Sequence, residues 1–245
     1  MYAFDLRNSA ILLDVDGTIL DIAPTRHDVH VPESLRHALR RVSERAGGAL
    51  ALVSGRPVRD LDEIFAPLRL PTIGGHGAEI RLLHNGGAPY RPATSLDRDL
   101  KNQLNDIAGR YPGVTIEDKG YSVALHYRTA LEHELDVVSD VFRLCKSYQP
   151  ASFELLTGKA VVEVKAAGYS KGTAVRELMT HKPFAGRVPI FIGDDITDEA
   201  AFAVMPEFRG VAISVGRRVP GILGAFHSPG EVRQWLERLS DDVAA

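Results

Sequence analysis

Two aspartates, Asp14 and Asp16, stand one residue apart where an apolar segment ends and a glycine follows. The run 11–13 is apolar and is bounded by Gly17, which is typical of a buried strand that leads into a turn. Strand alternation directs both aspartates to one side and Val15 to the core. Two like charges at a buried strand end are costly unless a cation neutralises them. A hard divalent ion, Mg²⁺ first, meets that need, and one aspartate can then act as nucleophile while the other transfers protons.

The same segment is also compatible with a solvated turn or an isolated Ca²⁺ loop, because Asp and Gly are turn residues. A Ca²⁺ loop requires further acidic residues at alternate positions and a closing Glu. Thr18, Leu20 and Ile22 stand at those alternate positions, so the Ca²⁺ loop is disfavoured.

The composition is that of an ordinary globular protein. The chain has 245 residues, 44% of them hydrophobic and 25% charged, enough for one large domain or two modest ones. A net charge of -3 gives no long-range attraction for nucleic acid or an acidic membrane, and we interpret the pairs Arg40-Arg41 and Arg217-Arg218 as solvated charges. No stretch approaches the apolar length of a membrane span. The first residues include the charged Asp5 and Arg7 and lack the pattern of a signal peptide, so we expect a cytoplasmic location.

The single cysteine, Cys145, rules out a disulfide framework and a thiolate metal site. It continues a helical stripe through Leu131, Leu135, Val138 and Phe142. The spacing predicts that this stripe faces the core and that Cys145 is a buried thiol and not a nucleophile.

Four further apolar segments predict strands: Ala49–Val53, Thr72–Ile73 with its flanks, Pro189–Ile192 and Val211–Val215. Helical patterns separate several of them, and the helix through Leu35 and Leu39 is entered by Pro32 and closed by Gly47-Gly48. Apolar strands that alternate with helices indicate a parallel sheet covered on both faces. Ligands then bind beyond the carboxyl ends of the strands, where Asp14, Ser54, Asp194 and Asp195 lie.

The middle of the chain, from about Tyr90 to Ala167, follows a different pattern of helix, two strands, helix and two strands. Thr94 and Asp97 predict a capping box at the start of the first helix. This repeat indicates an antiparallel sheet with helices on one face. We therefore expect a lid over residues 91–167, inserted into a sheet domain made of residues 1–90 and 168–245. The strands expected in the lid are Val114–Glu117, Ser122–Tyr127, Phe153–Leu156 and Ala160–Val164, and its helices run near 96–107 and 131–148.

Two positions suit phosphate binding. Ser54 follows the second strand and can cap a helix near Pro57; the hydroxyl and free N–H groups of a helix start hold a phosphate, although an ordinary N-cap explains Ser54 equally well. Ser170 predicts another N-cap, which places Lys171 in the first turn, against the helix dipole. Lys171 can neutralise a phosphate and the carboxylate attacking it, or it is a solvated surface lysine.

The segment Gly193–Glu199 contains four acidic residues. Thr197 can cap a following helix, and Asp198 and Glu199 suit its first turn. That explanation leaves Asp194 and Asp195 at a strand end, where metal binding or support of a metal ligand accounts for them.

Taken together and in this order, these motifs resemble those of the haloacid dehalogenase (HAD) superfamily of phosphatases: Asp-x-Asp-Gly-Thr, a Ser or Thr, a Lys, then Gly-Asp-Asp-x-x-x-Asp. The resemblance implies an α/β fold, with a Rossmann-like parallel-sheet core and an inserted α+β cap. An Asp at position 16 favours a phosphatase or mutase over a dehalogenase. The implied catalytic residues are Asp14, the nucleophile that forms an aspartyl-phosphate, Asp16, the general acid and base, and Lys171. The implied Mg²⁺ ligands are Asp14, Asp16 and Asp194, and the implied phosphate-binding residues are Ser54, Gly55 and Lys171. Asp195 and Asp198 would lie just outside the metal ligands, with Asp198 orienting Lys171.

The lid narrows the resemblance to the trehalose-6-phosphate phosphatases, over residues 9 to 215. The segments that carry it are Ser54–Arg56, Gly74–Glu79, Glu117–Gly120, Ala124–Arg128, Gly158–Glu163 and Gly193–Glu199. Carboxylates and ammonium groups are suitable partners for sugar hydroxyls. A solvated sheet face with Lys–Glu cross-strand pairs is the alternative, and His76 can equally be a structural residue of a Gly-rich turn. The substrate-binding residues that the resemblance implies are Arg56, His76, Glu117, Lys119, Arg128, Lys159 and Glu163.

We therefore expect an Mg²⁺-dependent phosphatase that hydrolyses a small sugar phosphate, trehalose 6-phosphate, to trehalose and phosphate in trehalose biosynthesis. The resemblance also implies a functional link to a trehalose-6-phosphate synthase. One alternative is a phosphatase for a sucrose- or mannosylglycerate-type sugar phosphate on the same scaffold. Another is a sugar-phosphate-binding regulator without turnover, against which the intact pair Asp14 and Asp16 argues.

Overall fold

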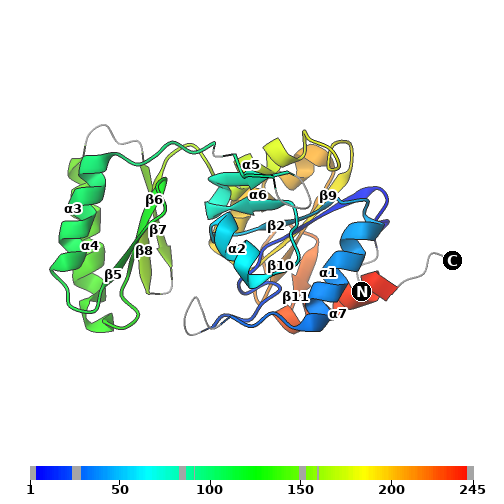
Figure 1. Ribbon diagram of the computed structural model, residues 1–245, viewed down its shortest axis with the longest axis horizontal. Helices are drawn as coiled ribbons and strands as arrows, with labels where there is room; N and C mark the ends of the chain where they lie inside the picture. Colours follow the sequence, from blue (N-terminus) through cyan, green and yellow to red (C-terminus); the bar gives the residue numbers. More distant parts are fainter. Residues whose placement is uncertain are drawn as a thin grey trace. The chain divides into compact units, whose positions relative to one another are not determined.

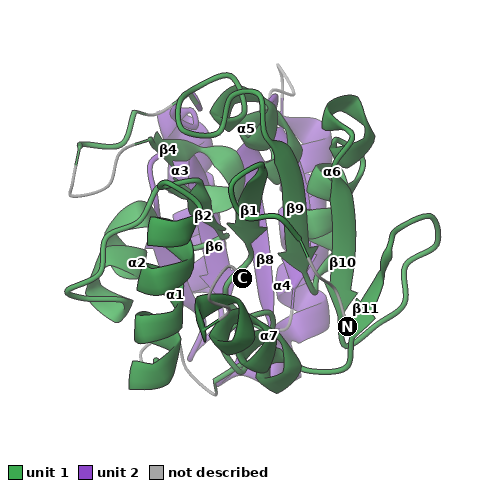
Figure 2. Ribbon diagram, turned by 90° about the vertical axis from the view of Figure 1, so that its right-hand side faces the viewer, with its two compact units in different colours: residues 1–92, 169–245 green, residues 93–168 purple. Residues whose placement is uncertain are grey.

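The computed structural model describes residues 4–23, 29–82, 87–90, 92–148, 153–158 and 160–241. The chain forms two compact units, which Figure 2 colours separately. Unit 1 consists of Met1–Pro92 and Tyr169–Ala245, and unit 2 consists of Ala93–Gly168. Unit 2 is therefore an insertion between the two segments that make unit 1.

Unit 1 contains a seven-stranded sheet in the order β11-β10-β9-β1-β2-β3-β4, of which Figure 2 labels β10, β9, β1 and β2. Each neighbouring pair is parallel except β3 with β4. Every residue of β1 and β2 is buried, as expected where both faces of a sheet are covered. The strands are β1 Ser9–Leu13, β2 Leu50–Val53, β3 Thr72–Gly74, β4 Glu79–Arg81, β9 Val188–Gly193, β10 Val211–Val215 and β11 Gly224–Phe226.

The helices of unit 1 pack partly in pairs, α1 against α7 and α5 against α6. Helix α1 buries Leu35 and Leu39 and ends before Gly47 and Gly48, whose φ angles are 55° and 89°, as the sequence predicts. Among the described residues no helix combines the length and apolar character that a membrane span requires. The helices are α1 Glu33–Arg45, α2 Val58–Ile64, α5 Lys171–Leu178, α6 Glu199–Phe202 and α7 Pro229–Asp241, with 3-10 turns η1 Gly75–Gly77, η3 Ile196–Asp198 and η4 Met205–Phe208.

The strand order determines which of the polar residues at the strand ends lie close together. Strand β1 lies between β2 and β9, and the three strands run in the same direction. Their carboxyl ends therefore share one edge of the sheet, where the crevice of a parallel α/β sheet binds ligands. Asp14, Ser54 and Asp194 each follow directly after one of these strands.

Unit 2 contains a four-stranded antiparallel sheet in the order β5-β6-β8-β7. Two helices, α3 and α4, lie on one face of this sheet (Figure 1). The predicted architecture, a parallel α/β core with an inserted α+β segment, is therefore confirmed. The elements are α3 Arg98–Gly109, β5 Thr115–Asp118, β6 Ser122–His126, η2 Leu131–His133, α4 Glu134–Ser147, β7 Phe153–Gly158 and β8 Val161–Ala166.

The start of α3 differs from the prediction. Asp97 is itself the N-cap, and its side chain accepts hydrogen bonds from the backbone N–H groups of Asp99 and Leu100. The predicted capping box, with Thr94 as the cap, is wrong. A carboxylate directly before the first turn satisfies two of the free N–H groups, so the helix begins at Arg98.

The predicted buried stripe of α4 is also wrong. Leu135 and Phe142, two of its members, are 84% and 50% exposed. The buried face instead carries Val137, Val141 and Cys145, at intervals of four residues. Cys145 is a buried thiol as predicted, and burial raises its pKa to about 11.

Candidate active site

Asp14 lies at the centre of the polar residues that follow the central strands of unit 1. It is 4% exposed, and its backbone N–H donates to the carbonyl of Ile192 in β9. Its Oδ1 lies 2.7 Å from Lys171 Nζ, and its Oδ2 accepts a hydrogen bond from Thr18 Oγ1 at 2.9 Å. Each oxygen thus has its own donor, so the orientation of the carboxylate is fixed.

The turn after β1 brings Asp194 against Asp14. Gly17 has a φ of 83°, and a Cβ atom on it would lie 2.1 Å from Asp194 Oδ2. Only glycine permits both this backbone conformation and this close approach. The hydroxyl of Thr18, which is fully buried, also lies 3.3 Å from Asp194 Oδ1.

Lys171 is the first residue of α5, and Ser170 is its N-cap, as predicted. The Lys171 side chain is 3% exposed and lies 2.6 Å from Asp198 Oδ1 as well as 2.7 Å from Asp14 Oδ1. Burial opposes the charge of the ammonium, but the charges of Asp14 and Asp198 outweigh that effect and raise the pKa of Lys171 above its usual value. Lys171 is therefore a buried, charged group and not a solvated surface lysine.

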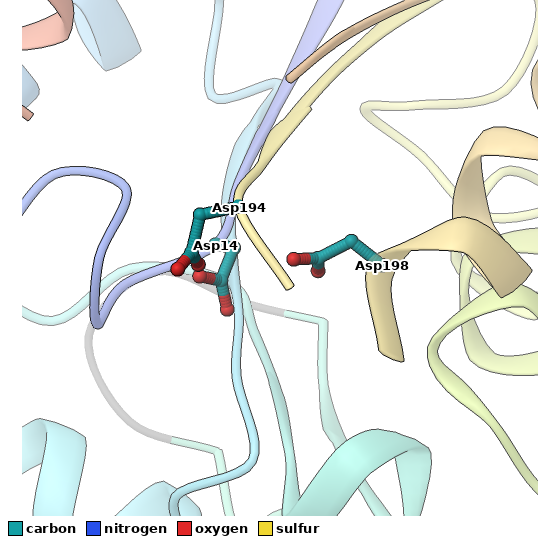
Figure 3. Close-up of side chains that lie close together, drawn as sticks. All are labelled: Asp14, Asp194 and Asp198. Carbon is teal, nitrogen blue, oxygen red and sulfur yellow. The ribbon is translucent and has the colours of Figure 1, made fainter. Parts of the chain in front are cut away.

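Three carboxylates, those of Asp14, Asp194 and Asp198, lie close together at the carboxyl ends of the central strands (Figure 3). Asp14, Asp194 and Asp198 each offer one oxygen, and these oxygens lie within 4.8 Å of one another; among the described residues this is the one such group. Burial, followed by the charge of Asp198, raises the pKa of Asp14 and of Asp194, and Lys171 only partly offsets the shift. Three carboxylates facing one ammonium leave uncompensated negative charge. A divalent ion with a preference for oxygen ligands would balance it, and the donor set therefore fits Mg²⁺.

The carboxylate of Asp16 is not part of this group. Its Oδ2 lies 2.6 Å from Arg56 Nε and its Oδ1 accepts from Arg56 Nη2 at 2.7 Å, a two-point ion pair. Strand β1 ends at Leu13, so strand alternation does not govern residue 16. The structure thus brings Asp14 and Asp194 together and gives Asp16 a different partner.

Two buried side chains, Ser54 and Glu79, accept hydrogen bonds from the backbone of the loop after β2 and the start of α2. Ser54, 2% exposed, accepts a hydrogen bond through Oγ from the N–H of Arg56. Helix α2 starts at Val58 after Pro57, with no side-chain cap from the preceding residue. The predicted N-cap role of Ser54 is wrong, and the buried Glu79 accepts the N–H of Val58 at 2.8 Å instead.

His76 lies against this loop. Its N–H donates to the carbonyl of Ser54 at 3.0 Å, and its φ of 56° is in the left-handed region. A Cβ atom on Gly55 would lie 2.4 Å from His76 Nε2, so the imidazole occupies the space that a side chain at position 55 would need. The structure therefore brings Ser54, Gly55 and His76 together.

The loop after β9 is organised by Asp195 and Asp198. The exposed Asp195 caps η3 by accepting from the N–H of Ile196 at 2.7 Å. Asp198, fully buried, accepts the N–H of Asp195 through Oδ2 at 3.0 Å, while its Oδ1 holds Lys171. The predicted cap at Thr197 is wrong, because the turn begins two residues earlier.

The interpretation of Arg217 as a solvated charge is also wrong. Its guanidinium donates to the backbone carbonyls of Asp194 and Asp195 and to the carboxylate of Glu199. Neither Thr18 nor Arg217 was expected at the site from the sequence. Thr18 lies within the first motif, which is a signal for it, whereas Arg217 has no sequence signal because its target is a turn far away in the chain.

In unit 2, the predicted sugar-binding residues Lys119 and Glu163 are paired. Lys119 Nζ lies 3.0 Å from Glu163 Oε1, with both side chains under 10% exposed, and Ser122 Oγ donates to the same oxygen at 2.5 Å. Glu117 and Glu163 are both opposite Ala124 in the sheet register, so they share one sheet face.

The other lid residues of the predicted set have different positions and partners. Glu117 Oε2 lies 3.2 Å from His126 Nε2, a partner that the sequence did not indicate. Arg128 is exposed after β6, and Lys159 lies outside the described residues. The Lys–Glu cross-strand pair expected from the alternative interpretation is present at Lys165 and Glu154, 2.7 Å apart.

A parallel α/β core with an inserted α+β unit defines the fold class, and a solved phosphatase of the HAD superfamily from Bacteroides thetaiotaomicron has the same fold, with a TM-score of 0.63, 16% identity, and coverage of 94% of each chain. Residues 12–220 match the family model of the trehalose-phosphatases, and the chain belongs to that family.

Individual relatives agree with the family model. The chain is 36% identical over 231 residues to the trehalose-6-phosphate phosphatase of Escherichia coli K12, covering 94% of this chain and 86% of the relative. It is 40% identical over 239 residues to a probable trehalose-phosphate phosphatase of Sinorhizobium fredii, covering 96% and 89%. The solved C-terminal domain of the C. albicans trehalose-6-phosphate phosphatase has the same fold, with a TM-score of 0.83, 21% identity, and coverage of 97% and 93%.

Proposed function

We propose that this protein hydrolyses trehalose 6-phosphate to trehalose and phosphate through a phosphorylated Asp14. The observation that carries the proposal is the buried Asp14 carboxylate at the end of β1, held between Lys171 and Thr18, in a chain of the trehalose-phosphatase family. A pure sugar-phosphate binder has no need of a buried carboxylate that is held in one orientation and whose pKa is raised.

In the first step an oxygen of Asp14 attacks phosphorus in line with the bond to the sugar oxygen. The P–O bond to the sugar breaks, and the bond from Asp14 to phosphorus forms. Lys171 remains charged beside the attacking carboxylate and offsets the negative charge that gathers there. Ser54 and Gly55, at the neighbouring strand end, bind the phosphoryl oxygens in this proposal.

Asp16 transfers the protons. In protonated form it gives its proton to the departing sugar oxygen. As a carboxylate it then takes a proton from the water that attacks the aspartyl-phosphate, and the bond from phosphorus to Asp14 breaks, which releases phosphate and restores the Asp14 carboxylate and the protonated Asp16. Both oxygens of Asp16 are bound by Arg56 in this structure. The contact with Arg56 must therefore loosen when Asp16 carries a proton, and Arg56 orients Asp16 in the alternate step.

Mg²⁺ is the metal that we propose for the acidic cluster. Asp198 has one oxygen on Lys171 and the other on the Asp195 N–H, which favours an orienting role and leaves Asp14 and Asp194 as ligands. When bound, the ion withdraws negative charge from the phosphoryl oxygens. With two carboxylate ligands, the remaining positions suit water and the substrate phosphate.

Unit 2 supplies sugar recognition in this proposal, and unit 1 supplies the phosphate chemistry. The paired Lys119 and Glu163, with Glu117 on the same sheet face, offer donors and acceptors that match sugar hydroxyls. Arg128 and Lys159 extend this set by family resemblance. A trehalose-6-phosphate synthase is the source of the substrate in the same proposal.

A phosphate-release assay over a panel of sugar phosphates tests the function, with Asp14→Asn as the inactive control and EDTA-treated protein as the metal control. The proposal expects trehalose 6-phosphate to have the highest kcat/KM, the Asp14→Asn protein to lose about 10⁴-fold or more in rate, and activity to return only on adding Mg²⁺. Preference for a sucrose- or mannosylglycerate-type phosphate would contradict the substrate, and full turnover by folded Asp14→Asn protein would contradict the nucleophile.

A further inference from the structure

We infer that Arg217 is a positioning residue for the metal site, acting through the backbone of the loop that carries Asp194. Arg217 lies after β10, two residues beyond its end, and is remote in sequence from every motif of the site. The inference rests on the metal assignment of the proposed function and extends it to a residue outside the metal ligands.

Three separate donors of Arg217 reach the loop after β9. Nε donates to the carbonyl of Asp194 at 2.7 Å, and Nη2 donates to the carbonyl of Asp195 at 2.8 Å. Nη1 donates to the carboxylate of Glu199 at 2.7 Å. A planar guanidinium can make such a set of bonds in one orientation, whereas a lysine ammonium cannot reproduce the fork.

The bond to the Asp194 carbonyl has a counterpart on the other end of the same peptide unit. The N–H of Asp195 donates to Asp198 Oδ2 at 3.0 Å. The peptide plane between Asp194 and Asp195 is thus held from both sides, by Arg217 and by Asp198. Because the Asp194 side chain is attached at one end of this plane, its carboxylate is directed toward Asp14.

Hydrogen bonds also hold the backbone of Arg217 in place. Its backbone carbonyl accepts a hydrogen bond from Ser214 Oγ at 2.6 Å, and Ser214 is fully buried in β10. The preceding Gly216 donates its N–H to the carbonyl of Phe226 in β11 at 2.9 Å. Strands β10 and β11 therefore fix the backbone of Arg217, and its guanidinium extends from there to the loop that carries Asp194.

On the opposite side, Asp194 is limited by the turn at Gly17, where a Cβ atom would lie 2.1 Å from its Oδ2. The carboxylate is thus enclosed between this turn and the loop that Arg217 holds. Residues that orient a metal ligand typically contribute about 10- to 100-fold to metal affinity. Loss of Arg217 should therefore weaken Mg²⁺ binding without removing any ligand.

The test compares Arg217→Gln and Arg217→Lys with Arg218→Gln, a neighbouring exposed arginine that loses the same charge. Mg²⁺ binding to EDTA-treated protein is measured by isothermal titration calorimetry without substrate, together with melting temperature and phosphate release over a range of Mg²⁺ concentrations. We expect the dissociation constant for Mg²⁺ to rise about 10- to 100-fold in Arg217→Gln, less in Arg217→Lys, and not in Arg218→Gln. High Mg²⁺ should restore kcat, and the protein without metal should still unfold in one cooperative transition, at a lower melting temperature than the parent because the hydrogen bonds of Arg217 are lost.

Wild-type affinity in Arg217→Gln would overturn the inference alone, as would a loss of kcat that excess Mg²⁺ does not restore. If Arg217→Gln does not fold, Arg217→Lys is judged by the same criteria. Absence of Mg²⁺ binding by the parent protein would overturn the metal assignment and this inference together. The parent titration therefore separates failure of the proposed function from failure of the role of Arg217.

Discussion

At the scale of single residues, the site is defined by which donor holds which carboxylate oxygen. Asp14 has Lys171 on one oxygen and Thr18 on the other, while Asp198 has Lys171 and the Asp195 N–H. Burial and then the charge of Asp198 raise the pKa of Asp14, and the ammonium of Lys171 opposes that rise, so the balance of charge at Asp14 depends on Lys171.

Replacing Thr18 by Val should lower kcat/KM about ten- to a hundredfold. The change keeps the size of the fully buried side chain but removes the hydroxyl that donates to Asp14, and a hydrogen bond to a charged group contributes roughly 1.5–3 kcal/mol. Steady-state phosphate release measures the effect. Thr18→Ser retains the hydroxyl and should stay close to the parent; an equal loss in both variants would show that packing of the methyl group matters and not the donor.

The sequence indicated the acidic residues and the lysine of this site but not all of their partners. Asp14, Lys171, Asp194 and Asp198 stand in motifs whose spacing limits where they can lie. The role of Arg217 depends instead on a turn that returns from β10 to the loop after β9, a distance that spacing along the chain does not encode. The partner of Asp16 was missed as a pair because Arg56 was considered only for the sugar.

At the scale of elements, the N-terminus of α3 separates two interpretations of one segment. Asp97→Ala should lower the melting temperature by about 2–4 °C, because the carboxylate accepts the N–H groups of Asp99 and Leu100. Thr94→Ala, which removes the cap expected from the sequence, should leave the melting temperature unchanged. The reverse ranking of the two variants in a thermal melt would contradict the observed cap.

The same cap predicts a pH dependence. Hydrogen bonds from the Tyr148 hydroxyl and then from the N–H groups of Leu100 and Asp99 lower the pKa of Asp97 from its usual 3.8. A lowered pKa in the folded state contributes stability above the usual value, and this contribution is lost as the pH falls through the lowered one. The difference in melting temperature between parent and Asp97→Ala should thus be constant near neutral pH and shrink below pH 3.8.

The thiol of Cys145, in helix α4, should react slowly with alkylating reagents. Burial raises the pKa of Cys145 from 9.0 to about 11, so its thiolate fraction at pH 8 is about a hundredfold below that of an unshifted thiol. Alkylation by iodoacetamide, followed by mass spectrometry, should be correspondingly slow and should accelerate with each pH unit up to about 11. Unfolding in denaturant should remove the protection; equal rates in folded and unfolded protein at pH 8 would rule it out.

Two short strands and the buried face of α4 differ from the prediction, each for its own physical reason. Strands β4 and β11 have three residues each, too few for a periodic pattern. The outward stripe of α4 was taken for the buried one because it holds more large apolar residues than the true inner face, where Val137 and Val141 are buried. Longer elements such as α1 and the central strands carry enough of a pattern to fix their type, although β1 begins at Ser9, two residues before the apolar run 11–13.

At the scale of the whole molecule, the division into two units separates sugar recognition from phosphate chemistry in our proposal. Lys119→Ala and Glu163→Ala should each reduce kcat/KM for trehalose 6-phosphate about ten- to a hundredfold, because a lost charged hydrogen bond no longer helps to orient the phosphate. A small aryl phosphate, which has no sugar to bind, should be hydrolysed nearly as well as by the parent.

A matched control lies in the same unit. Lys101→Ala removes a lysine that is paired with Asp118 at 3.0 Å, outside the set proposed for the sugar, and should leave both activities unchanged. Equal loss of both substrates in folded Lys119→Ala and Glu163→Ala proteins would mean that these residues serve catalysis or closure. That result would remove the main physical support for the substrate assignment.

The overall architecture was predictable because the two halves of the sequence pattern differ in kind. Continuous apolar strands between helices indicate a covered parallel sheet, and the repeat of one helix with two strands indicates an antiparallel one. The order of the strands, with β1 between β2 and β9, is not written in the pattern, although it decides that Asp14 and Asp194 meet.

The insertion of unit 2 also sets an order of events during synthesis on the ribosome. Asp14 leaves the ribosome before unit 2, whereas Lys171 follows 157 residues later and Asp194 and Asp198 later still, after all of unit 2 has emerged. Until then β1 lacks its neighbour β9, and Asp14, the nucleophile in our proposal, lacks the ammonium of Lys171 that pairs with it. An incomplete chain that ends before Lys171 therefore lacks residues that our proposal requires for hydrolysis of a sugar phosphate, and these residues meet only when the central sheet is complete.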